Sequence, residues 1–467
     1  MVDLISGSKK QLWDEIMKET AKKILDLALK IGADEAEVFI MKSEGKGFSI
    51  EKNSVSSLSG GMEKGIGIRV IKDKKLGFAF CTEEKKAEEA IKNALSLSKL
   101  GKESEFTLPE PGSTQRIENI YDEKIIDFTT QEALQGTKRL IEAVLEVDLD
   151  IVVTRGGVGF GSEKFVIVNS KGLEVEESGS EISASIGAVL KREGMSTGFE
   201  DFSSRVLNID FYQIGKSGAE LALKGQSAKK IESREMTVIF TPNALSNFLE
   251  FITASALYGE AIHKGESVYT DKLGQKVASE DLTILDDGAL SGGLNSAIVD
   301  DEGVSSKRNV LIKNGVLEGF LYSQSSALEY DAQNTANAMR VERLSSSRNY
   351  KSPPVVKARN IILEGEKTKY DTLISQVDEG VLVYDVMGAH TSNPVSGDFS
   401  VNSSILFKIE KGEIVHPVKS AMLGGNFHEC LQNISGIGDD YKLLSGGLTP
   451  AGFYIPSVGF NGIRVTG

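Results

Sequence analysis

The first hundred residues change from a helical to a strand-like hydrophobic pattern. Apolar residues recur at three- and four-residue spacing from Ile16 to Ile31, which predicts an amphipathic helix that ends near Gly32. Apolar residues then alternate with polar or glycine positions over 48–80, which indicates antiparallel strands, with a turn at KDKKLG. A second amphipathic helix is expected over about 83–100. This region therefore predicts helix, antiparallel strands and helix in that order.

The next segment is a polar connection followed by a second set of helices and strands. Residues 101–122 carry two of the nine prolines and predict an exposed linker. A helix through Leu140 and Val144 follows, and then long strands in which Asn169–Gly172 reads as a hairpin turn. A helix over about 210–225 ends this half.

The second half opens with a strand and a helix, MTVIFTP and NALSNFLEFITASALYG, and is mostly strand-like from about 281. The pattern predicts an α+β fold: an N-terminal α+β half with antiparallel sheets, and a mainly β, barrel- or sandwich-like C-terminal half with inserted helices. The predicted domains are 1–225 and 226–467. Within the first, regions of about 1–105 and 123–225 are joined by the polar, proline-containing linker.

Composition narrows the class of protein. The 467 residues contain 53 Lys+Arg and 67 Asp+Glu, a formal net charge of −14, with no long basic run, which argues against nucleic-acid binding. The two cysteines lie far apart and cannot form a disulfide framework. No apolar run approaches the roughly 20 residues that cross a bilayer, and MVDLISGSKK lacks the apolar core of a signal peptide. We therefore expect a soluble cytoplasmic protein without a membrane or nucleic-acid partner.

The four histidines offer few ways to build a metal site. The chain has neither an HExxH nor an HExxxH string. His428 and Cys430 would point about 200° apart on a helix, so we expect a surface histidine and a buried cysteine there. His416 is expected in an ordinary hairpin strand. His263 and His390 are predicted in loops, where a functional role is more plausible.

The remaining motifs are better explained by structural roles than by nucleotide or metal binding. The glycine-rich stretch 156–161 lacks the Lys-Ser/Thr of a phosphate loop and leads into a strand, which argues against nucleotide binding. The acidic segments Asp286–Asp287 and Asp300–Glu302 could bind a hard cation, but neither matches an EF-hand loop. Solvated turns are the preferred interpretation of both.

Five separate strings together carry a family resemblance over about residues 20–465. They are Ile31-Gly32-Ala33-Asp34, GIGIRVIKDKKLGFAF, KGESVYTDKLGQKVASEDLTILDDG, MGAHTSNPVSGDFSVNSSILFKIEKGEIVHPV and GIGDD. In this order they resemble the TldD/PmbA family, whose members were once named modulators of DNA gyrase. The resemblance implies a cytosolic, dimeric protein that takes part in peptide or protein processing.

The same resemblance implies what this chain lacks. TldD members are zinc metallopeptidases with an HExxxH helix and a cysteine near the C-terminus. Counting back from Lys264, the two metal histidines fall on Glu250 and Ser255, and the general base falls on Phe251. GGLTPAGFYIP, where the cysteine would lie, contains none, and Cys430 lies too early. A phenyl ring cannot deprotonate water and a serine hydroxyl is a poor zinc ligand, so the chain resembles the PmbA branch, also called TldE.

Three hypotheses follow. In the first, the chain is a metal-free subunit, with zinc only in a TldD-type partner, and it holds an extended peptide in a β-lined cleft. In the second, it is a self-sufficient peptidase with a site rebuilt from other residues. In the third, it is a non-catalytic dimer that binds a protein partner. A homodimer and a heterodimer both remain open. No catalytic residue is assigned, and the candidates near the cleft are Glu250, Ser255, His263 and His390.

Overall fold

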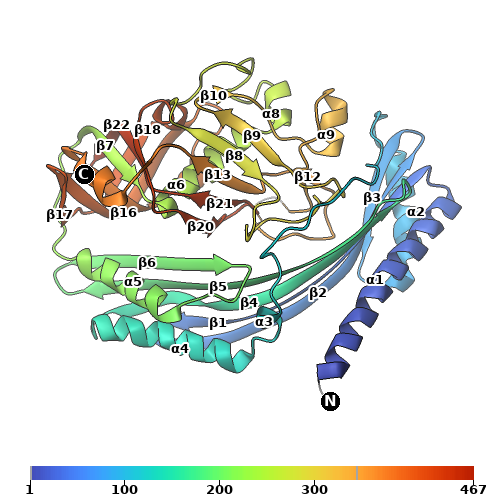
Figure 1. Ribbon diagram of the computed structural model, residues 1–467, viewed down its shortest axis with the longest axis horizontal. Coiled ribbons are helices and arrows are strands. Elements are labelled where there is room, and N and C mark those ends of the chain that lie inside the picture. Colours follow the sequence, from blue (N-terminus) through green and yellow to red (C-terminus); the bar gives the residue numbers. More distant parts are fainter. Residues whose placement is uncertain (1–2, 343–344) are drawn as a thin grey trace.

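The N-terminal half is built on one long, curved antiparallel sheet (Figure 1). The computed structural model describes residues 3–342 and 345–467, and six strands of this half pair in the order β3-β2-β1-β4-β5-β6. These are β1 (Glu35–Glu51), β2 (Ser54–Lys72), β3 (Lys75–Cys81), β4 (Val152–Asn169), β5 (Glu174–Lys191) and β6 (Met195–Ser204). The predicted hairpin turn at 169–172 is confirmed, with Gly172 at φ +90°, a value that favours glycine.

Helices cover the face of this sheet that points away from the C-terminal half (Figure 1). α1 and α2 pack on β1 and β2, and α4 and α5 pack on β4 and β5. A capping box between Thr129 and Glu132 starts α4. The helices and the 3-10 turn of this half are α1 (Asp3–Ile31), η1 (Glu84–Lys86), α2 (Ala87–Ser98), α3 (Glu123–Ile126), α4 (Thr130–Val147) and α5 (Phe211–Lys224).

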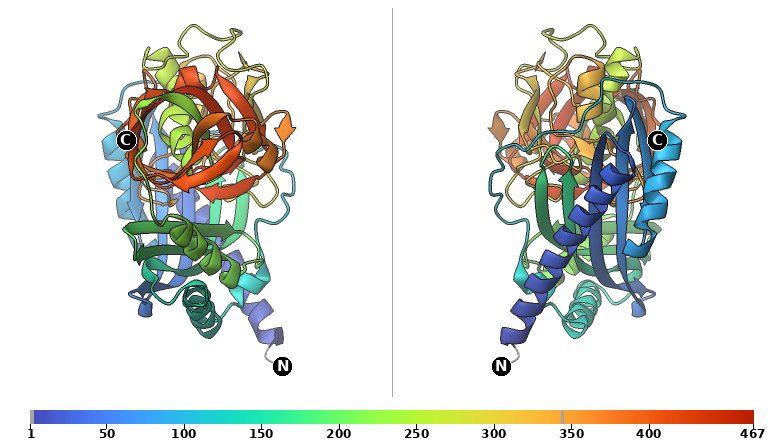
Figure 2. Two further views of the ribbon diagram at one scale, coloured as in Figure 1. Left: turned by 90° about the vertical axis from the view of Figure 1, so that its left-hand side faces the viewer. Right: turned by 90° about the vertical axis from the view of Figure 1, so that its right-hand side faces the viewer.

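A closed five-stranded barrel forms the centre of the C-terminal half. Its order is β7-β15-β16-β18-β22, and β22 also pairs with β7, which closes the ring seen in the left view of Figure 2. The barrel core contains Phe248, whose ring packs against Phe240, Phe399 and Phe427. The strands are β7 (Arg234–Phe240), β15 (Glu379–Met387), β16 (Asp398–Glu410), β18 (Ala421–Asn426) and β22 (Val458–Thr466).

A second sheet and short elements surround the barrel. The sheet has the order β10-β9-β8-β13-β21-β20 and consists of β8 (Thr283–Asp287), β9 (Arg308–Lys313), β10 (Val316–Leu317), β13 (Asn360–Glu364), β20 (Lys442–Ser445) and β21 (Gly452–Ile455). The remaining strands are β11 (Ala338–Met339), β12 (Val355–Val356), β14 (Lys367–Thr368), β17 (Glu413–Pro417) and β19 (Ile434–Gly438). The helical segments are α6 (Pro242–Phe248), η2 (Leu249–Thr253), α7 (Ala254–Ala256), α8 (Gly259–His263), α9 (Gln324–Glu329), α10 (Tyr370–Ser375), η3 (Ala389–Thr391) and α11 (Phe427–Cys430).

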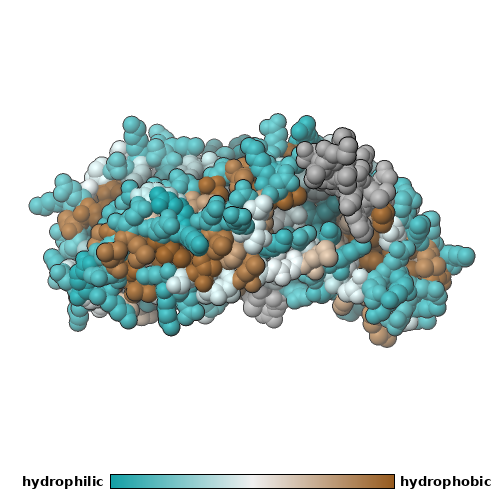
Figure 3. Space-filling model, turned by 90° about the horizontal axis from the view of Figure 1, so that it is seen from below, coloured by the Kyte–Doolittle hydropathy of each residue, from teal (hydrophilic) through white to brown (hydrophobic). Residues whose placement is uncertain are grey.

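The predicted fold class is confirmed: helices make up 24% and strands 41%, and the barrel lies in the C-terminal half. The proposed boundary at 225/226 stays a prediction, and it falls between α5 and β7. Among the described residues, none of the helices is long and apolar enough to span a membrane. On the underside, hydrophobic side chains gather toward the end where α4 and α5 lie, bordered by hydrophilic residues (Figure 3).

The prediction of two solvated acidic turns is wrong. Asp286, Asp300 and Asp301 are fully buried, and Glu302 is 1% exposed. Distant residues compensate the burial. Asp286 accepts hydrogen bonds from the Asn337 side-chain amide at 2.6 Å and the Arg359 N–H at 2.6 Å. Burial still raises the pKa of Asp286 to about 6.

Buried ion pairs join the two halves. Glu37 of β1 pairs with Arg69 of β2 at 2.5 Å, and Arg69 also pairs with Glu302 at 2.7 Å. Arg348 pairs with Asp301 at 2.8 Å and with Glu163 of β4. The acidic segments of the C-terminal half therefore contact the sheet of the N-terminal half.

Candidate functional site

Glu250 lies in a π-helical turn, where the helix that begins at α6 changes its hydrogen bonding. The N–H of Ala254 donates to the carbonyl of Leu249, five residues earlier, as in a π-helix. In an α-helix, side chains five residues apart point about 140° apart. In a π-turn this angle is smaller, because the hydrogen bonds join residues five apart. Such turns are rare and recur at functional sites.

The Glu250 carboxylate is held by a loop that lies 197 residues further along the chain. Glu250 is 6% exposed, and its Oε2 accepts from the Gly447 N–H at 2.9 Å. Oε1 accepts from the N–H groups of Leu448 at 2.8 Å and Thr449 at 2.7 Å. This loop belongs to the GGLTPAGFYIP stretch. Both carboxylate oxygens are therefore already occupied by backbone donors, which leaves Glu250 poorly placed to act as a base or a metal ligand.

The two neighbours of Glu250 in the candidate motif contribute no acid–base group. The Phe251 ring lies edge-on to the His390 imidazole, with ring centroids 6.1 Å apart. The Ser255 hydroxyl donates to the carbonyls of Phe251 at 3.3 Å and Ile252 at 3.2 Å, within its own helix. One side of this helix packs into the core, since these five residues are buried: Leu245, Phe248, Leu249, Ile252 and Ala256.

His263 belongs to a different group of side chains. Its ring stacks on Tyr330 with centroids 4.1 Å apart, and its Nε2 lies 3.3 Å from the Tyr322 hydroxyl. The loops predicted for His263 and His390 are in fact short helical turns, because His263 ends α8 and His390 lies in η3. Of the four candidates, the structure brings His390 to the Glu250–Ser255 segment through Phe251. No described contact joins His263 to it.

The structure also corrects the predicted position of His428. It was predicted at the surface but is 4% exposed, and its Nδ1 lies 3.1 Å from the Tyr269 hydroxyl. Burial lowers the pKa of His428 to about 4. Cys430 is buried as predicted, and burial raises its pKa to about 12. A buried thiol that resists ionisation is a poor candidate for a nucleophile.

A groove of about 630 Å³ opens beside this segment. Ser255 lies in its wall, together with Tyr258, Lys357 and Pro394, and the short strand β12 forms part of the rim. β12 pairs only with β11 among the named strands. The groove therefore offers backbone groups at a strand edge next to the π-turn.

Zinc, which the resemblance implies for TldD members, does not fit these residues. Zinc sites use histidine, cysteine or carboxylate ligands, usually three or four together. Here the corresponding positions hold a carboxylate bonded to three N–H groups, a phenyl ring and a serine hydroxyl. Over 3–342 and 345–467, no three His, Cys, Asp or Glu side chains are grouped as a metal would require.

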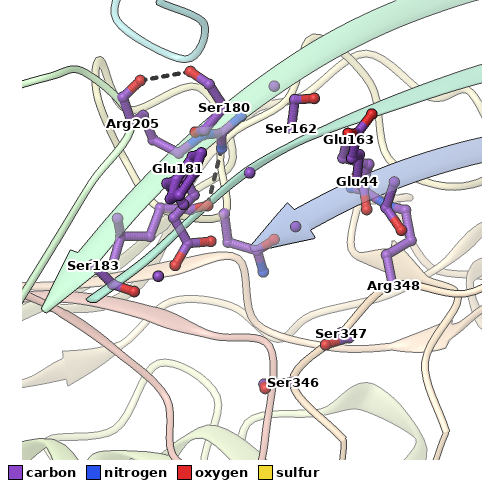
Figure 4. Close-up of a pocket in the computed structure, with 18 of the residues that line it drawn as sticks. Glu44, Ser162, Glu163, Ser180, Glu181, Ser183, Arg205, Ser346, Ser347 and Arg348 are labelled. Carbon is purple, nitrogen blue, oxygen red and sulfur yellow. Dashed lines mark hydrogen bonds and ion pairs between the residues drawn. The ribbon is translucent and has the colours of Figure 1, made fainter. Parts of the chain in front are cut away.

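A second cavity, of about 480 Å³, lies between the concave face of the long sheet and the C-terminal half (Figure 4). None of its residues was among the predicted candidates. Its walls include Glu177, Glu181, Arg205 and Arg348. Two acidic residues in the sequence could have indicated this cavity. Glu177 and Glu181 share one face of a strand that is otherwise rich in small residues.

Comparison with known proteins relates all three regions of the chain to one family. Residues 233–467 match the PmbA/TldA metallopeptidase C-terminal domain, 36–98 match domain 1, and 123–226 match the central domain. An uncharacterised protein of Methanocaldococcus jannaschii is 31% identical over 89% of this chain and 95% of its own. A metalloprotease TldD homologue of Haemophilus influenzae is 26% identical over 91% and 89%. The crystal structure of TldE from Thermococcus kodakarensis superposes with a TM-score of 0.88, at 27% identity, over 96% of this chain and 100% of that one.

Proposed function

Because the chain belongs to the PmbA/TldD metallopeptidase family, we propose that it is a subunit of a peptide-processing assembly that carries no metal of its own. Its partner is a zinc-bearing TldD-type chain, and the pair encloses the peptide to be cut. Zinc and the attacking water belong to that partner. This chain contributes peptide binding and part of the enclosure.

One observation carries the proposal: the carboxylate of Glu250 is bonded to the N–H groups of Gly447, Leu448 and Thr449. The family resemblance implies that, in relatives with the HExxxH helix, the corresponding segments supply the first metal ligand and a cysteine ligand. In this chain the same two segments bind each other directly. The contact fills the place of the metal with a hydrogen-bonded carboxylate and stabilises the loop without an ion.

The peptide-binding role is supported by the groove beside Ser255. An exposed strand edge can bind an extended peptide through backbone hydrogen bonds, whatever the peptide sequence. β12 offers such an edge, and Val355 next to the groove is 41% exposed. A subunit that holds peptide backbone would serve an enzyme whose substrates are unfolded segments.

The test measures metal and activity together. The purified chain is analysed by inductively coupled plasma mass spectrometry and assayed on an unfolded protein substrate, alone and after co-expression with a TldD-type chain of the same genome. We expect no stoichiometric zinc in the chain alone, no peptidase activity alone, and chelator-sensitive activity in the pair. One tightly bound zinc per chain would overturn the proposal.

The same assay separates the self-sufficient peptidase. Activity of the chain alone that resists chelators and disappears in His390→Ala would support a rebuilt site near Phe251. His263→Ala is the matched control, because His263 lies in the separate group with Tyr322 and Tyr330. Failure to recover a TldD-type chain in a stoichiometric complex would favour the non-catalytic interaction protein.

A further inference from the structure

The cavity between the two halves is hollow because the sheet carries small residues there. Gly45 of β1 pairs with Gly161 of β4, and Gly161 pairs with Glu181 of β5. The neighbouring row of this sheet contains Ser43, Glu163 and Gly179. Two adjacent rows therefore place six residues with small side chains or carboxylates on the floor. The roof comes from the C-terminal half: Leu294, Asn295, Ser296, Met339, Ser346, Ser347 and Arg348.

The cavity contains more acidic than basic groups, and most of its acidic groups are already paired. Glu163 forms an ion pair with Arg348, and both are labelled at one end of the cavity in Figure 4. Glu63 pairs with Lys351 at 2.7 Å, and Glu44 with Lys46 at 3.8 Å. The carboxylates that remain are Glu177 and Glu181, both on β5.

Glu177 is a buried carboxylate with one free oxygen. It lines the cavity and is only 9% exposed. Its Oε2 accepts from the Ile298 N–H at 2.5 Å, whereas Oε1 makes no hydrogen bond or ion pair with any described residue. Glu181 likewise has no hydrogen-bond or ion-pair partner in the described part of the chain, and it lies beside Arg205 and Ser183 in Figure 4. Glu181 is exposed, whereas Glu177 is buried. For Glu177, a buried acceptor without a donor costs free energy that a ligand with an N–H group would recover.

Arg205, one of the two arginines that line the cavity, has most of its donors committed elsewhere. Arg205 donates through Nε to the Ser180 carbonyl at 2.7 Å and through Nη2 to the Ile120 carbonyl at 2.8 Å. Its Nη1 donates to the carbonyls of Leu294 at 2.9 Å and Ser296 at 3.3 Å. Four of its five N–H groups are thus committed to the backbone. Oε1 of Glu177 and the carboxylate of Glu181 therefore remain open to a ligand that donates hydrogen bonds.

We infer that this cavity binds an ammonium or guanidinium group, with the carboxylate of Glu177 or that of Glu181, on either side of Arg205, as its acceptor. In the setting of the proposed function the group is the side chain of a lysine or arginine in the bound peptide, so the substrate class is basic peptides. A free polyamine offers the same chemistry. Burial raises the pKa of Glu177 to about 7, and a cation beside it would favour the charged form.

The test uses an acetylated, amidated pentapeptide, Ala-Ala-Lys-Ala-Ala, and the same peptide with norleucine in place of lysine. Binding to the full chain is measured by titration calorimetry, with spermidine as a separate titrant. We expect the lysine peptide to bind at least about tenfold tighter than the norleucine peptide, since a charge-assisted hydrogen bond contributes about 1.5–3 kcal/mol. Glu177→Gln or Glu181→Gln should remove most of this preference, and the variant that does so identifies the acceptor; retention of the preference in both variants would overturn the inference.

Glu176→Gln is the matched control. Glu176 is the neighbour of Glu177 on β5, lies on the opposite face of the strand, and pairs with Lys164 at 3.7 Å. Its replacement should leave the lysine preference unchanged. Glutamine at 177 can still accept from the Ile298 N–H, and the thermal unfolding of each variant reports whether it is folded.

The outcomes separate the inference from the proposed function. Equal affinity for the two peptides, together with no binding of spermidine, would overturn the inference and leave the metal-free subunit intact. Binding of spermidine alone, lost in Glu177→Gln, would support the site and assign it to a small polyamine. Peptidase activity of the pair with a TldD-type chain is measured independently, and its absence bears on the proposed function alone.

Discussion

Arg340 of the C-terminal half is fully buried against Glu37 of β1, which lies 303 residues earlier in the chain. The same carboxylate accepts from Arg69 at 2.9 Å and 2.5 Å. One buried anion thus joins guanidinium groups from both halves. The family models divide the chain into three regions, but this contact couples the first of them to the last.

Glu37→Gln should therefore destabilise the whole chain. Removing one charge from a buried ion pair leaves its partner uncompensated and costs about 3–5 kcal/mol. The free energy of unfolding is measured in urea, followed by fluorescence and by circular dichroism. Asp34→Asn is the control, because Asp34 and Lys72 form an exposed pair at 2.7 Å, and it should change little. Unfolding of Glu37→Gln at the wild-type urea midpoint would contradict the expected coupling.

Glu250→Ala should release the loop at 447–449. Its three backbone N–H groups lose their acceptor, and we expect a loss of about 2–3 kcal/mol, since hydrogen bonds to charged groups contribute about 1.5–3 kcal/mol. Hydrogen exchange of the amides of Gly447, Leu448 and Thr449 should become faster. Ser255→Ala removes only a hydroxyl that bonds its own helix, and it should leave the exchange of these amides as it is.

His428 should make the protein less stable in acid. Burial lowers its pKa to about 4 in the folded state, against about 6.5 when unfolded. The unfolded state then binds the proton more tightly, so stability is fully present above pH ~6.5 and is lost as the pH falls toward ~4, by on the order of 3 kcal/mol. Urea unfolding at pH 7 and pH 5 measures the loss, which His428→Gln should reduce. His416→Gln, on β17, should retain the wild-type pH dependence.

Glu177 should make the protein less stable as the pH rises, the opposite of the effect of His428. Its pKa of about 7 lies above the ~4.3 of an unfolded glutamate, so its contribution is present below pH ~4 and is lost as the pH rises through ~7. The wild type should therefore lose about 2–3 kcal/mol of unfolding free energy from pH 5 to pH 8 through this group, and Glu177→Gln should not. The difference between Glu177→Gln and the wild type should grow by that amount over this range. Glu176→Gln should show no such change. A constant difference between wild type and Glu177→Gln across this range would show that Glu177 ionises as an exposed glutamate does.

Local patterns were enough to predict the strands, the turns and the fold class. The alternation over 48–80 and the turn at 169–172 depend on near neighbours only, and both were predicted correctly. The buried acidic groups could not be predicted this way. Asp301 is compensated by Arg348, 47 residues away, and Glu177 by Ile298, 121 residues away. Acidic runs are usually exposed to solvent unless other residues neutralise or hydrogen-bond them. Residues this far away in the chain do not appear in the local hydrophobic pattern.

The family resemblance related Glu250 and the stretch containing 447–449 to one candidate site, which stays a prediction. The structure shows hydrogen bonds between these two segments. The resemblance could not predict that the carboxylate binds the backbone of that stretch. His428 was misplaced because its partner, Tyr269, lies 159 residues away in the chain.

The π-turn at 249–253 has a consequence for how such chains are compared. It is a feature of the backbone, and the backbone of this chain superposes on a solved TldE structure with a TM-score of 0.88. Under the proposed function, the helix keeps its backbone geometry while the residues at 250, 251 and 255 hold no metal. Backbone shape alone would then not separate such a chain from a metal-binding relative, whereas the chemistry of these three side chains would. A backbone kept in this way is also the natural starting point for returning a metal to the site by design.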